Sequence, residues 1–73
     1  NLPVHREAFE KGRKYHTLTQ RIEMLRAEIR DLRREALAST DPNISRSSLE
    51  FEAFMLRMDI DILLRERRKY ESL

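Results

Sequence analysis

A regular spacing of apolar residues over residues 15–36 constrains the fold more than any other feature of this chain. Apolar side chains recur there at alternating steps of three and four residues. This is the heptad pattern of a helix that packs against a partner along one seam. The repeat continues towards the amino terminus, with an interruption at Lys11, and we predict a helix over residues 4–39. Its seam positions are Tyr15, Leu18, Ile22, Leu25, Ile29, Leu32 and Ala36.

A polar break separates this segment from a second apolar one. The break, "ASTDPNISRSS", contains Pro42, and the residue before a proline is pushed away from helical backbone angles. Ser47 and Glu50 form a capping-box pattern just before the next apolar run. We therefore predict a loop over residues 40–46 and a second helix over residues 47–72. An alternative start has the aspartate before Pro42 as the N-cap and Pro42 as the first helical residue.

The second helix has a heptad seam of its own, and the two seams fit in one antiparallel register. Pairing residues whose numbers add up to 85 forms seven layers at once, from Tyr15 with Tyr70 to Ala36 with Leu49. A short connection also favours antiparallel neighbours. The predicted fold is all-α, an antiparallel two-helix coiled-coil hairpin, with both seams except Arg67 as its core. The seam positions of the second helix are Leu49, Ala53, Leu56, Ile60, Leu63, Arg67 and Tyr70.

The second helix also has an apolar face that the hairpin does not use. A helix that is apolar on two sides is ordinarily buried by more than one neighbour, and the first helix has no matching second stripe. Burying five large apolar side chains contributes on the order of 10 kcal/mol before the costs of association. At about 100° per residue, the residues nearly opposite the seam are Phe51, Phe54, Met55, Met58 and Ile62.

Three partners would cover this face. The arrangement that we favour is a homodimer in which the second helices lie at the centre of a four-helix bundle, because it also enlarges the small core of a 73-residue chain. The second partner is an amphipathic helix of a different protein, for which a surface rich in Met and Phe is suited. The third is another helix of a parent protein. The chain begins with Asn1 rather than Met, and we expect a single domain over residues 1–73 that is a piece of a longer protein.

Arginines cluster late in the first helix and are the candidates for contacts with an anionic partner. Acidic residues are interspersed among them, and the net charge is only +2 although 38% of the residues are charged. The predicted register also brings Arg26 near Arg57. A solvated surface is therefore favoured over a nucleic-acid footprint, and a basic helical hairpin that binds nucleic acid is the alternative from another class. The clustered residues are Arg26, Arg30, Arg33 and Arg34.

No motif predicts catalysis, a cofactor or a metal site. His5 and His16 are the only histidines, and no acidic cluster at a metal-ligand spacing accompanies them. Asp59 and Asp61 are two residues apart and lie on different faces of a helix, so they do not converge as an acid and base pair. The sequence therefore predicts a non-enzymatic oligomerisation and protein–protein interaction scaffold, without a cofactor.

The absence of cysteine and of long apolar runs bears on the compartment. A small secreted fold usually needs disulfides, so a chain without cysteine is expected to be intracellular, in the cytoplasm rather than the nucleus. No apolar run approaches the roughly 18 to 20 residues that cross a bilayer. We therefore predict no membrane span.

Overall fold

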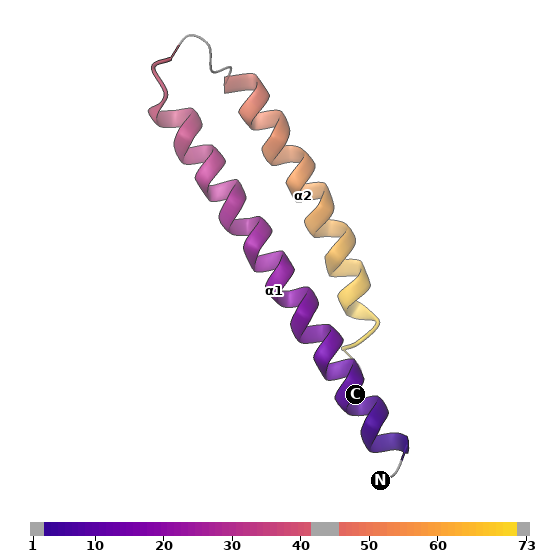
Figure 1. Ribbon diagram of the computed structural model, residues 1–73. Coiled ribbons are helices and arrows are strands. Elements are labelled where there is room, and N and C mark those ends of the chain that lie inside the picture. Colours follow the sequence, from indigo (N-terminus) through magenta and orange to yellow (C-terminus); the bar gives the residue numbers. More distant parts are fainter. Residues whose placement is uncertain (1–2, 42–45, 72–73) are drawn as a thin grey trace.

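The computed structural model of this chain is a pair of antiparallel helices that lie side by side (Figure 1). It describes residues 3–41 and 46–71, without the side chains of residues 3–5. Helix α1 spans Pro3–Ala38 and helix α2 spans Arg46–Arg68. The Cα atoms extend over 61 × 15 × 13 Å. The described residues contain no strand, and the predicted all-α helical hairpin is confirmed.

The core lies along the line where the two helices meet. Ile22, Ile29, Ala53 and Ile60 are buried. The partly buried leucines that pack against them are Leu25, Leu32, Leu56, Leu63 and Leu64. All thirteen side chains expected in the hairpin core are buried or half-buried, because heptad spacing returns them to the same side of each helix. The core is one layer thick, since each helix has only one neighbour.

Helix α2 begins close to the expected position, but Ser47 is not its N-cap residue. It starts at Arg46, one residue earlier than expected, so Ser47 lies inside the first turn rather than at the N-cap. Arg46 pairs with Glu50 one turn further along, with its Nε 3.8 Å from a carboxylate oxygen. The alternative start at Pro42 falls on residues 42–45, outside the described residues. Helix α1 is displaced by one residue at each end from the expected range 4–39.

Helix α2 ends at Arg68, four residues before the expected end, and a tight turn follows. The backbone N–H groups of Lys69, Tyr70 and Glu71 donate to the carbonyl oxygens three residues earlier, at 2.9 to 3.3 Å. Such shorter-range hydrogen bonds tighten the end of a helix. The turn places the half-buried Tyr70 ring against α1, where the Lys14 ammonium lies 5.6 Å from the ring centroid.

Arg67 is the one charged residue in the seam of α2, and it bonds across to α1. Its guanidinium carbon lies 5.0 Å from the centroid of the Tyr15 ring, and its Nη1 donates to Thr19 Oγ1 at 3.0 Å. Its Nε is buried without a hydrogen-bond partner. The contacts of Arg67 with Thr19 and of Tyr70 with Lys14 join residues whose numbers add up to 86 and 84, close to the constant sum of the expected register.

Gly12 lies inside α1, where glycine is unfavourable, and no close contact requires a residue without a side chain at this position. A Cβ added at this position would meet no atom within 4 Å, and its φ is not positive. Glycine inside a helix is less favourable than alanine by about 0.5–1 kcal/mol. We therefore expect Gly12→Ala to raise the free energy of unfolding by about that amount, measured by urea denaturation. The matched control is Ala8→Gly, an exposed position of the same segment, which should lower it. A less stable Gly12→Ala variant would contradict the open space seen at this position.

Candidate interaction surfaces

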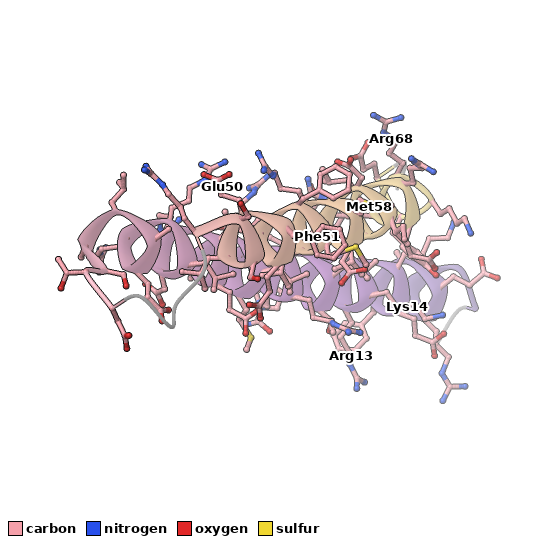
Figure 2. The ribbon with its side chains drawn as sticks, turned by 90° about the horizontal axis from the view of Figure 1, so that it is seen from above. Arg13, Lys14, Glu50, Phe51, Met58 and Arg68 are labelled. Carbon is pink, nitrogen blue, oxygen red and sulfur yellow. The ribbon has the colours of Figure 1, made fainter. Side chains whose placement is uncertain are left out.

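Among the described residues, the largest cluster of exposed apolar side chains lies on the side of α2 that is turned away from α1. We call this surface the outer face of α2. Its side chains are 46% to 64% exposed, whereas the seam residues of α2 are buried or half-buried. Figure 2 looks onto this side of α2, with two of the residues labelled. The outer face consists of Phe51, Phe54, Met55, Met58 and Ile62.

Among its described side chains, helix α1 has no comparable surface. Its exposed large apolar residues are Phe9, Met24 and Leu37, each more than ten residues from the next. Single exposed apolar residues of this kind are ordinary on protein surfaces. The outer face of α2, by contrast, gathers five residues between Phe51 and Ile62, a length of about 16 Å along a helix. A contiguous apolar patch is a marker of an interaction site.

A line of acidic side chains flanks the outer face on one side. Glu52, Asp59 and Glu66 follow one another at seven-residue intervals, so they lie along one edge of α2. Glu66 pairs with Lys69 at 3.5 Å. Within the part of the chain that the structure describes, Glu52 and Asp59 are exposed and make no ion pair. We call these three residues the acidic strip.

A groove with arginines on its rim runs along the other edge of the hairpin. It is formed by two adjoining hollows between α1 and α2, and Arg33 and Arg57 line both of them. Its floor is apolar and includes Leu32, Leu49 and Leu64. Figure 2 shows Glu50 on this edge, and Arg13 and Lys14 on the opposite one. We call it the arginine groove, and its arginines are Arg26, Arg30, Arg33, Arg46 and Arg57.

The groove contains three of the four arginines expected to meet an anionic partner. Arg26, Arg30 and Arg33 line it, whereas Arg34 does not and lies 3.9 Å from Asp31 of the same helix. The expectation from the sequence did not include the two arginines that α2 contributes, Arg46 and Arg57. The signal for Arg57 was present, because the antiparallel register already placed it near Arg26.

The acidic residues of the groove limit its positive field. Glu50 and Asp61 line it beside the arginines, and Glu50 is paired with Arg46. Mixed charges of this kind weaken the attraction for an extended polyanion. The groove is therefore better matched to a ligand that has an apolar side as well as negative charges, because its floor is apolar.

The residues considered for metal or acid–base chemistry do not converge. The described residues contain no group of three His, Asp or Glu side chains that could hold a metal ion. Asp59 belongs to the acidic strip and Asp61 to the arginine groove, so they lie on different sides of α2. His16 is exposed, and the side chain of His5 lies outside the described residues.

Neither of the two described helices has the composition of a membrane-spanning helix. Neither α1 nor α2 contains a stretch that is both long and apolar enough to cross a bilayer. Both helices carry charged residues in every turn or two, which is the reason for this result.

Comparisons with known proteins do not place the chain in a family. No family model matches it, and neither does any curated protein or solved structure. The outer face of α2 and the arginine groove are therefore the features that bear on its function.

Proposed function

We propose that this protein is a non-enzymatic oligomerisation and protein–protein interaction module. Two hairpins associate through the outer face of α2, and each contact brings four helices together in a bundle. The exposed apolar stripe supports this proposal, because it lies on a hairpin that buries only four apolar side chains among its described residues. Association would add a second layer to a core that is marginal for a chain of this size.

The degree of exposure sets the strength expected of this contact. The five side chains already bury about half of their surface within the hairpin. Burying the remainder contributes about half of the 1.5–3 kcal/mol assigned to a fully buried apolar side chain, or on the order of 5 kcal/mol for each outer face. This is comparable with the cost of association, about 4–15 kcal/mol. Self-association should therefore be reversible and dependent on concentration.

Sedimentation equilibrium on the wild-type chain and on a variant with Met58→Glu and Ile62→Glu tests the proposal. The wild-type mass should exceed the 8.8 kDa of one chain and rise with concentration. The variant should remain at 8.8 kDa, because two carboxylates in the stripe would be desolvated by contact. Its helix content, measured by circular dichroism, should stay close to that of the wild type, because both residues are exposed.

The matched control variant carries Phe9→Glu and Met24→Glu. These residues are at least as exposed as those of the outer face but lie on α1, so the control should associate like the wild type. A wild-type chain that stays at 8.8 kDa at every concentration would end the self-association proposal and favour a helix of a different protein as the partner. Unchanged association of the variant with Met58→Glu and Ile62→Glu would show that another surface is used.

A further inference from the structure

Charges beside the outer face of α2 oppose a symmetric contact between two such faces. In an antiparallel pairing with Met55 opposite Met58 of the second copy, the acidic strips of the two copies lie side by side. Glu52 then neighbours Asp59 of the second copy, and the symmetry repeats this contact. A parallel pairing places Asp61 beside Glu66 of the second copy in the same way. Both arrangements bring acidic side chains of the two copies together, and this repulsion between like charges disfavours them.

The arginine groove has mainly the opposite charge, because its five arginines outnumber Glu50 and Asp61. Arg30, Arg33 and Arg57 are exposed and make no ion pair within the described residues. The floor between them is apolar and runs on to the exposed Leu37 at the end near the turn. An amphipathic helix with an apolar face and an acidic flank fits such a groove. The outer face of α2 with its acidic strip is a surface of this type.

The two surfaces also agree in length. The α1 residues that line the groove run from Arg26 to Leu37, and the outer face of α2 runs from Phe51 to Ile62. Each covers eleven residue steps, or about 16 Å at the rise of an α-helix. One outer face would therefore fill one groove from end to end.

We propose that the outer face of α2 of one hairpin docks into the arginine groove of a second copy. Glu52 and Asp59 of the docked helix then lie beside the arginine rim. This inference rests on the proposed self-association and names the surface that the outer face meets. Because the contact joins two different surfaces and each copy presents both, copies add head to tail. The docked α2 contacts both helices of the groove, and its own α1, packed against it, is the fourth helix of the bundle, at the edge furthest from the groove.

Two variants, each lacking one of the two surfaces, test this arrangement by complementation. The first carries Arg30→Glu and Arg33→Glu and keeps its outer face. The second carries Met58→Glu and Ile62→Glu and keeps its groove. Each alone should sediment at 8.8 kDa, and an equimolar mixture should form a complex of twice that mass. A third variant with all four changes is the matched control and should not associate with either. Circular dichroism checks that the four exposed substitutions leave the helices intact.

The dependence of self-association on salt concentration is an independent test, because the two arrangements predict changes in opposite directions. Attraction between acidic strip and arginine rim weakens as salt screens it, so the dissociation constant of the wild-type chain should rise by about fivefold between about 0.05 M and 0.5 M salt. A symmetric contact between two acidic strips would instead tighten with salt. Tightening would therefore overturn the head-to-tail arrangement.

Three other outcomes would also overturn the head-to-tail arrangement. They distinguish a failure of this arrangement from a failure of the proposed self-association. If the Arg30→Glu, Arg33→Glu variant associates alone like the wild type, the groove is not used and self-association through α2 stands. If the two variants are both monomeric but do not combine, the two surfaces do not meet. If the wild-type chain binds heparin at low salt through Arg30 and Arg33 while its mass does not depend on them, the groove serves a polyanion such as nucleic acid.

Discussion

Replacing Ile22 with alanine is expected to lower the free energy of unfolding by about 2–5 kcal/mol. Ile22 is the one large side chain, among the described residues, that is fully buried, with 0% of its surface exposed. Its loss removes apolar contacts and leaves a cavity in a core that has no second layer. A chain of this length has a total stability of about 4–11 kcal/mol, so the change would remove a large part of it.

Urea denaturation followed by circular dichroism measures this effect. The control is Met24→Ala on the same helix, where the side chain is 71% exposed, and its effect should stay within about 0.5 kcal/mol. Both variants should be compared at low concentration, so that association does not contribute to stability. Equal effects of the two substitutions would show that the seam is not the core.

Exchanging Leu32 and Ala53 between the two helices is expected to be tolerated far better than either change alone. Both residues line the same hollow, and Ala53 is only 3% exposed. Leu32→Ala should cost about 2 kcal/mol, because the half-buried leucine leaves a gap. Ala53→Leu should cost about 1–3 kcal/mol by overpacking. Together they keep the volume of the layer, so the double variant should regain most of the loss.

A double-mutant cycle in urea measures the coupling of this pair. We expect a coupling of about 1–3 kcal/mol between Leu32 and Ala53, as found for residues in contact. The control cycle combines Ala53→Leu with Leu25→Ala, which lies about two turns of helix away, and should be additive. Additive effects of Leu32→Ala and Ala53→Leu would contradict the register of the hairpin.

The sequence allows the helical hairpin to be predicted because two independent heptad segments fit in one register. Ile22 and Ile29 on α1, and Ala53 and Ile60 on α2, are the buried residues, and all four are seam positions. The exposed stripe that begins at Phe51 also follows from helical geometry alone, since the position of a side chain around a helix depends only on its residue number.

Features that depend on contacts between the helices could not be predicted in the same way. Nothing in "RERRKY" breaks a helix, yet α2 ends at Arg68, where the following turn brings Tyr70 against Lys14. The arginine groove combines residues of both helices, and Arg57 joins it only through the packing of α2 on α1. Arg34 belongs to the same run of arginines in the sequence but lies outside the groove, because a helix turns it away.

Arg67 makes one alignment of the two helices distinct from the others. A periodic seam looks the same after a slide of seven residues, so apolar packing alone discriminates weakly between neighbouring alignments. Such a slide towards the turn would move the guanidinium opposite Leu25, away from the Tyr15 ring and the Thr19 hydroxyl that it contacts in the native structure. A charge without these partners is costly to bury. Arg67 thus raises the free energy of misaligned hairpins. Its main effect is to increase the free-energy difference between the native and the misaligned states, rather than to stabilise the native state itself.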